Sequence, residues 1–278
     1  VYGVLKMLNF AHGSVFMVGA FAGWGVLSLL ARGNVLATNP ALALLAMVAA
    51  GAAATALLGA TIERLAYRPL RGGSRMAPLI SALGVSIILE NAAMLLTSGR
   101  AKTYQTELIF PQTWAVHVAG ATISATRIAM LASSVAIMIL LDIVVSRTRF
   151  GRAMRATSQD AEAAEYIGIR TTAVIAGTFI IGSALAGVAG VMVGLYYTQI
   201  DFMIGFSAGL KAFTAAVLGG IGDFRGAAAG GMLLGLAESI GVLIAPPVYK
   251  DAIVFAVLII TLILRPAGLL GRQVRARA

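Results

Sequence analysis

Five polar side chains that could do chemistry lie within apolar stretches of the sequence: Asn9, His12, Glu90, Asn91 and Glu238. Where such stretches cross a membrane, an ionisable group inside them is costly and is by default a candidate for function. Asn9 and His12 are three residues apart and would share a helix face, where they either mark a membrane boundary, stabilise a helix break or line a pathway. Glu90 is either a pathway residue or a protonated or hydrogen-bonded carboxyl group that joins two helices. All five residues are candidates for lining a pathway through the membrane.

The longest polar segment, Arg147–Arg170, has the sequence RTRFGRAMRATSQDAEAAEYIGIR and offers a different chemistry, the recognition of a partner. Its pattern predicts two short helices, the first at about residues 150–156 and the second starting from Asp160. Thr157, Ser158 and Asp160 can each cap a helix N-terminus by accepting bonds from free backbone N–H groups.

The second of these helices is short, with Glu162 near its positive N-terminal end and Gly168 supplying a left-handed stop. Ala163, Ala164 and Ile167 form one small apolar face, which is too short to bury against its own domain. A short capped helix between two membrane spans suggests a docking site for a soluble partner. The alternative is a solvated loop whose charges only fix the topology.

The composition places the chain in a membrane. Hydrophobic residues make up 59% of it and charged residues 12%, against about 45–50% and about 25% in soluble domains. The sequence has no cysteine, which excludes disulfides, thiolate metal sites and cysteine nucleophiles, and its two histidines exclude a multi-histidine metal site. The net charge of +10 could indicate nucleic-acid binding. Because most Arg and Lys lie between apolar blocks, where topology requires them, that interpretation is rejected.

The apolar blocks are about as long as a bilayer crossing and predict an all-α, polytopic membrane protein with residues 1–278 as a single transmembrane domain. About eight membrane segments are expected: one ending near Ala31, and then residues 40–63, 76–98, 125–145, 171–197, 206–222, 226–245 and 250–264. Residues 206–222 are too short to span comfortably and end in GGIG, which indicates a re-entrant or broken helix. Within residues 171–197, a stripe of small residues predicts close helix packing at Gly182, Ala186, Gly190 and Gly194.

The positive charges sort to one side when these segments alternate across the membrane. Fifteen of the 21 Lys and Arg residues fall on that side: Lys6, four in residues 64–75, five in residues 147–170, Arg225 and four in the tail. Six fall on the other side: Arg32, Arg100, Lys102, Arg127, Lys211 and Lys250. Because cytoplasmic loops carry the excess of positive charge, residues 147–170 and the C-terminus are expected in the cytoplasm.

Sequence signatures of several catalytic and nucleotide-binding classes are missing. The sequence contains no GxxxxGK[ST] loop, so nucleotide binding through a P-loop is excluded. It also contains no HExxH helix and no GxGxxG fingerprint. An enzymatic function is therefore not favoured.

Eight stretches, in order along nearly the whole chain, carry a family resemblance: LNFAHG (8–13), RPLRG (68–72), APLISALGVSIILEN (77–91), GRAMRATSQDAEAAEYIGI (151–169), GFSAGLKAFTAAVLGGIG (205–222), GLAES (235–239), KDAIVF (250–255) and LRPAGLLG (264–271). Together they resemble the permease subunits of the branched-chain amino-acid ABC importers. Single stretches are weak signals, but the ordered set is highly specific.

The resemblance implies an all-helical importer subunit, multi-pass in a prokaryotic plasma (inner) membrane. Such permeases pair with a second related permease subunit, are driven by two cytoplasmic ATPase subunits and receive substrate from a periplasmic binding protein. No cofactor is implied for this chain, because the partner subunits hydrolyse the ATP. On this resemblance residues 147–170 are the segment that couples to the ATPase, with six candidate residues: Gly151, Arg152, Asp160, Glu162, Ala164 and Gly168.

Two departures from the family pattern matter. The family usually begins with another apolar helix upstream of LNFAHG, so an incomplete N-terminal helix is expected. Position 90 is Glu where the family more often has Gln, and whether Glu90 faces the pathway or a partner helix stays open.

Two other functions are considered. The first is a stand-alone secondary transporter that uses Glu90, Asp142 or Glu238 as a proton or ion site. The second is a membrane anchor without a pathway. Related permeases serve leucine-type amino acids, other amino acids, urea or amides, and the sequence does not choose among these substrates.

Overall fold

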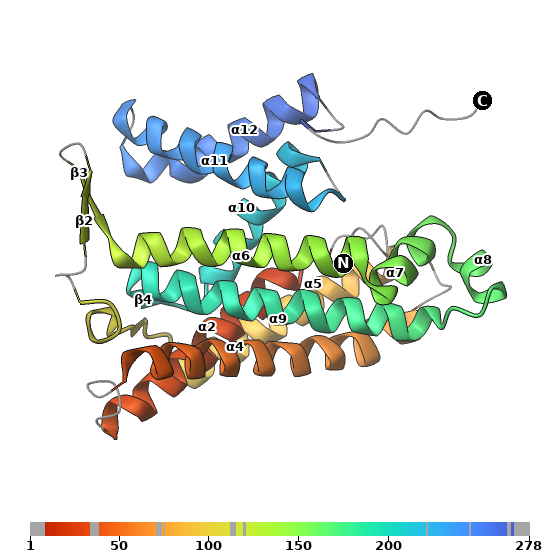
Figure 1. Cartoon of the computed structure of the whole chain (residues 1–278), viewed down its shortest axis with the longest axis horizontal. Helices are drawn as coiled ribbons and strands as arrows, with labels where there is room; N and C mark the ends of the chain where they lie inside the picture. The colour runs from red at the N-terminus through yellow and green to blue at the C-terminus, as the bar shows by residue number, and fades with distance from the viewer. Residues whose placement is uncertain are drawn as a thin grey trace.

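The computed structural model describes residues 9–33, 39–70, 74, 76–111, 115–118, 121–220, 222–244, 246–265 and 268–269. Its long helices are α2 (His12–Arg32), α4 (Pro40–Ile62), α5 (Ala77–Thr97), α6 (Ala125–Arg147), α9 (Thr171–Tyr197) and α11 (Phe224–Ile244). Each is long and apolar enough to cross a membrane, which gives six candidate spans within the described residues. Figure 1 shows these helices lying mostly along the long axis of the molecule. The expected all-α, polytopic architecture is confirmed.

Two further apolar helices coincide with expected membrane segments but are shorter. They are α10 (Ile204–Gly219), with 16 residues, and α12 (Lys250–Leu264), with 15 residues. A helix that crosses the hydrocarbon core needs about 20 residues. Six of the expected segments are therefore long enough to span, and the count of about eight stays a prediction.

Short elements connect the long helices. Helix α4 continues through a π turn, Glu63–Tyr67, and a 3-10 turn, Arg68–Leu70. Helices α7 (Arg149–Gln159) and α8 (Ala161–Tyr166) separate α6 from α9. Two antiparallel ribbons pair β1 (Lys102–Thr103) with β4 (Gln199–Ile200), and β2 (Ala115–Val118) with β3 (Ala121–Ser124). Two more 3-10 turns lie at Thr106–Leu108 and Pro247–Tyr249.

The core is formed where α2, α4 and α9 touch backbone to backbone. A Cβ atom added to Gly19 of α2 would lie 2.4 Å from the Cα of Gly187 on α9. A Cβ atom on Gly187 would in turn lie 2.4 Å from the carbonyl oxygen of Gly51 on α4. Small residues let membrane helices approach this closely, so glycine at these positions holds the three helices as one tight unit.

The predicted stripe of small residues on α9 contributes to this core. A Cβ atom on Gly190 would lie 2.3 Å from the carbonyl oxygen of Phe16, and one on Gly194 would lie 2.7 Å from the ring of Tyr104. Ala186 is also buried. The packing role expected for these three residues is confirmed.

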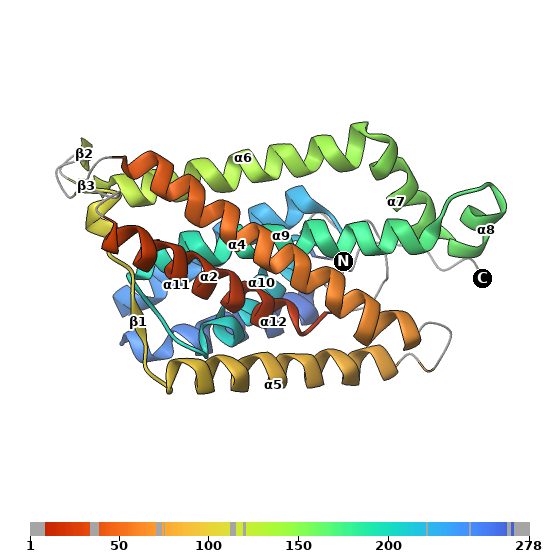
Figure 2. The same cartoon turned by 90° about the horizontal axis from the view of Figure 1, so that it is seen from below.

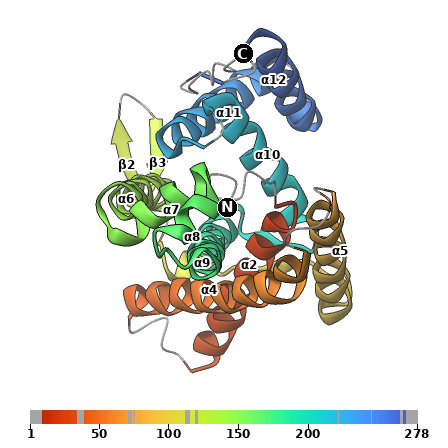
Figure 3. The ribbon, with the colours of Figure 1, turned by 90° about the vertical axis from the view of Figure 1, so that its right-hand side faces the viewer.

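Helix α10 lies between the core and the last two helices. It contacts α2, α11 and α12, and Figure 3 shows it between α2 and α11. At its start, a Cβ atom on Gly13 would lie 2.3 Å from the carbonyl oxygen of Gly205. At its end, Gly219 and Gly226 make an equally close contact. Helix α10 is thus packed on α2 at one end and on α11 at the other.

The connections between helices lie at the two ends of the molecule that the charge pattern distinguishes. The end of α4, the start of α5 and helices α7 and α8 lie at one end, and β1, β2 and β3 lie at the other (Figure 2). Lys6, Arg71, Arg75 and the arginines of residues 271–278 lie outside the described residues.

Candidate functional site

Both helices of the predicted docking segment are capped by side chains. At the start of α7, the hydroxyl oxygen of Thr148 accepts a hydrogen bond from the backbone N–H of Gly151 at 3.0 Å. At the start of α8, the carboxylate of Asp160 accepts one from the backbone N–H of Ala163, also at 3.0 Å. Each cap satisfies a donor that the helix leaves free. The break at Asp160 is therefore encoded locally, and the prediction of Asp160 as an N-cap is confirmed.

Helix α7 extends beyond the predicted residues 150–156 at both ends. Thr157 and Ser158 consequently lie inside α7, and the expectation that either could cap the next helix is wrong. The hydroxyl of Ser158 donates instead to the carbonyl oxygen of Arg155 at 2.8 Å, and Thr157 is buried.

The predicted left-handed stop after α8 is confirmed. Gly168 has a φ of +87°, a conformation that glycine adopts without steric cost. Its backbone N–H donates to the carbonyl oxygen of Glu165 at 2.9 Å, and the N–H of Ile169 donates to that of Ala164 at 3.0 Å. This pair of bonds is the Schellman arrangement that closes a helix C-terminus.

The six candidate residues of the segment divide by exposure. Four of them are exposed: Arg152, Asp160, Glu162 and Gly168. The other two, Gly151 and Ala164, are buried. A Cβ atom on Gly151 would lie 2.1 Å from the carbonyl oxygen of Val145 in α6. Glycine therefore lets α7 fold back against the last turns of α6, and the two buried residues act in packing rather than at the surface.

The surface of α8 carries an apolar tip that the sequence pattern indicated only in part. Tyr166 is 83% exposed and Ile167 is 75% exposed. The predicted face of Ala163, Ala164 and Ile167 is wrong for Ala164, which turns inward. Tyr166 was not among the candidates, although an aromatic residue beside Ile167 in so short a helix is a usable signal. Two large exposed side chains at a helix tip suit an anchor for a partner.

Helix α7 is fixed to α9 by apolar contacts. Met154 is buried in a cluster with Val174 and Ile175 of α9. A Cβ atom on Gly177 of α9 would lie 2.7 Å from the ring of Phe150, so glycine makes room for this ring. Helix α7 is therefore packed directly on the first half of α9, which runs on into the core.

The candidate pathway residues near the start of α2 form local contacts. The side-chain oxygen of Asn9 accepts bonds from the backbone N–H of Ala11 at 3.1 Å and from the hydroxyl of Tyr67 at 3.0 Å. Asn9 thus joins the start of α2 to the π turn after α4, which favours the interpretation as a stabiliser of the helix start. The Nδ1 atom of His12 is buried and has no hydrogen-bond partner within the described part of the chain.

Glu90 faces a partner helix. Its Oε1 atom accepts bonds from the hydroxyls of Ser14 and Ser86, each at 3.1 Å. The two hydroxyl oxygens are 2.7 Å apart, so the three residues form one polar contact between α2 and α5. Asn91 does not join it, because its side chain is exposed and donates to the carbonyl oxygen of Ile87 in its own helix at 2.8 Å. The five candidates are therefore not brought together in one site.

Glu238 forms an ion pair away from the other candidates. Its Oε1 atom lies 2.8 Å from the Nζ atom of Lys211 on α10. Lys211, one of the six basic residues expected on the side opposite to residues 147–170, lies inside α10. A lysine is ordinarily expected at a membrane boundary, and the partner that lets it lie within a helix is 27 residues away in the sequence.

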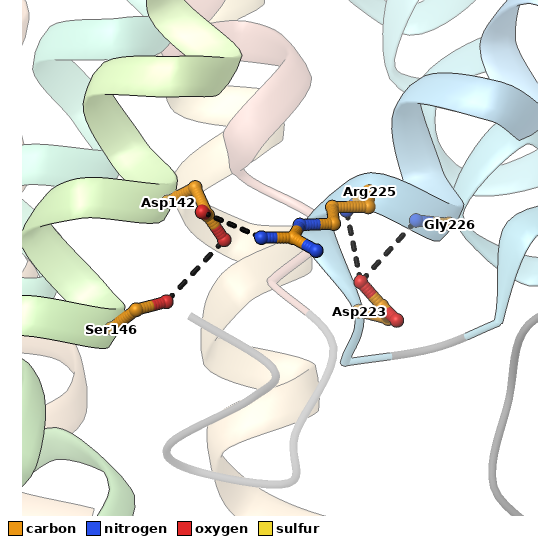
Figure 4. Close-up of polar contacts among 5 residues, drawn as sticks. All are labelled: Asp142, Ser146, Asp223, Arg225 and Gly226. Atoms are coloured by element: carbon orange, nitrogen blue, oxygen red, sulfur yellow. Dashed lines mark hydrogen bonds and ion pairs between the residues drawn. The ribbon is translucent and has the colours of Figure 1, made fainter.

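A second ion pair joins the start of α11 to the last turns of α6 (Figure 4). The guanidinium of Arg225 lies 2.9 Å from the carboxylate of Asp142, which also accepts a bond from the hydroxyl of Ser146 at 3.3 Å. Asp223 holds the start of α11 by accepting bonds from the backbone N–H groups of Arg225 and Gly226, at 2.9 and 3.3 Å.

Comparison with known proteins identifies the family. The family model described as "Branched-chain amino acid transport system / permease component" matches residues 1–262. The chain belongs to this permease family. The permease is 45% identical over 276 residues to the high-affinity branched-chain amino acid transport system permease protein BraD of Pseudomonas aeruginosa, covering 98% of this chain and 88% of that protein. It is 41% identical over 275 residues to the corresponding protein LivH of Escherichia coli K12, with the same coverage of each chain. No solved structure matches.

These relatives are subunits of transport systems rather than enzymes. One sequence pattern of the permease could still suggest a hydrolase, because GFSAG at residues 205–209 matches the GxSxG elbow. Ser207 lies within α10 rather than on a turn between a strand and a helix. The glycines on either side of it, Gly205 and Gly209, pack against Gly13, so the pattern serves helix contact.

Proposed function

We propose that this permease is the membrane subunit of an ATP-driven importer for branched-chain or related amino acids. The observation that carries the proposal is the identity of 45% to a permease of a branched-chain amino acid transport system along almost the whole chain. The capped α7–α8 segment, with its uncovered tip at Tyr166 and Ile167, supplies the surface that such a subunit needs for its motor.

The proposed importer has four kinds of partner around this chain. Two cytoplasmic ATPase subunits hydrolyse ATP, a second related permease completes the membrane part, a periplasmic binding protein delivers substrate and the lipid bilayer surrounds the spans. The assembly lies in the prokaryotic inner membrane, with residues 147–170 and the C-terminus in the cytoplasm. This orientation is supported by the charge pattern, since the described basic connections gather at the end that carries α7 and α8.

The proposed mechanism is mechanical. The tip of α8 sits in a groove of an ATPase subunit, and closure of the ATPases on ATP displaces it. Helix α7 moves with α8 and passes the displacement to α9 through the packing of Phe150 and Met154. Because α9 is locked to α2 and α4 by backbone contact, the core moves as a unit and changes the side to which the pathway opens. No bond is made or broken in this chain.

The docking step is tested by replacing the apolar tip. The double variant Tyr166→Ala with Ile167→Ala should weaken copurification of the ATPase subunits by at least about tenfold, because exposed aromatic and aliphatic anchors dominate binding at such surfaces. The matched control is Val248→Ala with Tyr249→Ala, which removes another exposed pair of an aromatic and an aliphatic side chain, between α11 and α12. Equal recovery of the ATPases with both double variants would contradict the docking role.

The energy source is tested in membrane vesicles. Uptake of leucine should stop when ATP is depleted and continue when the proton gradient is collapsed. The opposite result would favour the secondary transporter.

A further inference from the structure

The ion pair between Lys211 and Glu238 has no role in the mechanism described so far. The Nζ atom of Lys211 lies 2.8 Å from Oε1 of Glu238, and the two side chains are 28% and 18% exposed. The Oε1 atom of Glu238 is itself buried, but neither side chain is fully buried and neither residue lies at a helix end. The pair is therefore shielded but not completely enclosed.

The pair also lies deep within its helices. Lys211 precedes the last residue of α10, Gly219, by eight residues, which is about 12 Å along the helix axis. Glu238 follows the first residue of α11, Phe224, by 14 residues, or about 21 Å. These two distances lie on either side of about 15 Å, which is half the thickness of a hydrocarbon core of about 30 Å.

Packing of α10 on α11 does not require these charges. Gly219 and Gly226 are in backbone contact, and a Cβ atom on Gly230 would lie 2.1 Å from the carbonyl oxygen of Ala215. A buried ion pair is in general no more stabilising than apolar side chains of similar size. Charges that are kept inside a membrane segment without a structural need indicate a site for a solute or ion.

We propose that Lys211 and Glu238 bind the zwitterionic group of an amino acid on its way through the permease. The ammonium of Lys211 would donate to the substrate carboxylate, and the carboxylate of Glu238 would accept from the substrate ammonium. This inference rests on the importer function proposed above and narrows its substrate class. Urea and simple amides carry neither charge, so the pair selects amino acids over them.

The arrangement suits transient binding. In the empty permease the two charges neutralise each other. When the zwitterion enters, one ion pair is exchanged for two, so no charge in the membrane is left without a partner at any stage. Because the substrate must displace an existing pair, its net affinity is low, and low affinity lets it leave again, as conduction requires.

The surroundings of Lys211 indicate the side from which the substrate arrives. Tyr197, the last residue of α9, and Asp251, in the first turn of α12, both lie close enough to act electrostatically on Lys211. Helix α9 ends directly before β4, which lies at the end of the molecule opposite to α7 and α8 (Figure 1). The pair is thus reached from the end at which a binding protein would deliver substrate.

The test uses the complete importer in proteoliposomes, with binding protein loaded with leucine. The double variant Lys211→Met with Glu238→Met keeps the volume and removes both charges. It should assemble and should hydrolyse ATP in response to the loaded binding protein as the wild type does. Its uptake of leucine should be at least about tenfold slower, because loss of one charge-assisted hydrogen bond lowers binding by about that factor. The matched control is Ser239→Ala, which removes only a hydroxyl that bonds within α11 and should transport normally.

Uptake by the double variant within about twofold of the wild-type rate would overturn the proposal. If the double variant fails to assemble, Glu238→Gln answers the same question, because it removes one charge and keeps the shape. Normal uptake by Glu238→Gln would overturn the proposal, and loss of uptake with retained ATP hydrolysis would support it. Absence of ATP-driven uptake by the wild-type complex would instead contradict the proposed importer function.

A binding measurement separates recognition from mechanical coupling. Leucine titrated into the purified wild-type complex without binding protein should bind weakly, and leucinamide, which lacks the carboxylate, should bind at least about tenfold more weakly still. Equal binding of leucine and leucinamide would overturn the assignment of Lys211 to the carboxylate.

Discussion

Nη2 of Arg225 lies 2.9 Å from Oδ2 of Asp142, and this ion pair connects α11 to α6. Asp142 lies near the end of α6, shortly before the α7–α8 segment that we propose as the docking site for an ATPase subunit. Arg225 lies in the first turn of α11, beside the helix that carries Lys211. The pair therefore gives the docking segment a second connection, independent of α9, to the proposed substrate site.

Breaking this connection should reduce coupling without abolishing assembly. We expect Asp142→Asn and Arg225→Gln each to lower the amount of leucine moved per ATP hydrolysed, because α11 no longer follows α6. In the double variant, the amount of leucine moved per ATP should fall no further than in the more impaired single variant, because both substitutions remove the same interaction. The control Lys250→Gln removes an exposed charge at the opposite end and should leave the ratio unchanged. Strictly additive losses in the double variant would contradict a shared role.

Replacing Gly168 by a β-branched residue should uncouple transport. The φ of +87° would cost about 1–2 kcal/mol with a Cβ present, so α8 is expected to lose its closed C-terminus and its fixed orientation. Vesicles that contain the importer with Gly168→Val should hydrolyse ATP but take up little leucine. Gly168→Asn is the matched control, because asparagine tolerates left-handed backbone. Unimpaired transport by Gly168→Val would count against this role.

Adding one methyl group at Gly151 should loosen the docking segment. Its Cβ atom would lie 2.1 Å from the carbonyl oxygen of Val145, and overpacking of this kind costs about 1–3 kcal/mol. At Gly84 of α5 no atom lies within 4 Å of an added Cβ, so Gly84→Ala should be neutral or stabilising by up to about 1 kcal/mol. Thermal unfolding in detergent should therefore separate the two alanine variants, and equal midpoints would show that α7 is not tightly packed on α6.

Tyr104 should make the free energy of unfolding fall as the pH rises in the alkaline range. It is buried and its hydroxyl donates to the carbonyl oxygen of Ala20 at 2.5 Å, so Tyr104→Phe should cost about 0.5–1.5 kcal/mol near neutral pH. Burial raises the pKa of Tyr104 above its usual value. The stabilisation is fully present below the unfolded pKa of about 10 and is lost as the pH rises through the folded pKa. Unfolding midpoints of both proteins at about pH 8 and pH 11 should show the advantage of the wild type shrinking, and a constant difference would be evidence against the bond.

Local signals were sufficient to predict where helix α8 begins and ends. The caps at Asp160 and Gly168 depend on a few neighbouring residues, so their positions follow from the sequence alone. The length of α7 was underestimated because Thr157 is compatible with both a cap and a helix interior, and its burial in the tertiary structure decides between them. Likewise, nothing local distinguishes Ala164, which packs inward, from the exposed Ile167.

Contacts between helices could not be predicted in the same way. Glu90 was recognised as unusual, but its partner Ser14 lies 76 residues earlier in the chain. The count of basic residues places Lys211 on the side opposite to residues 147–170, although it falls within the expected segment 206–222. Only the structure shows that Glu238 compensates its charge. Hydropathy records each residue separately, whereas the cost of a charge in a membrane depends on what lies beside it.

Where Gly187 of α9 meets Gly19 of α2 and Gly51 of α4, the helix backbones touch directly and leave little room for one helix to shift against the others. Helix α9 has 27 residues and is therefore about 40 Å long. In the proposed mechanism, a displacement of Thr171 at one end of α9 should reach Tyr197 at the other end, together with both neighbouring helices. The three helices joined by these glycines should thus move as one stiff unit. The rate of the transport cycle should then depend on how this unit is displaced rather than on how it bends.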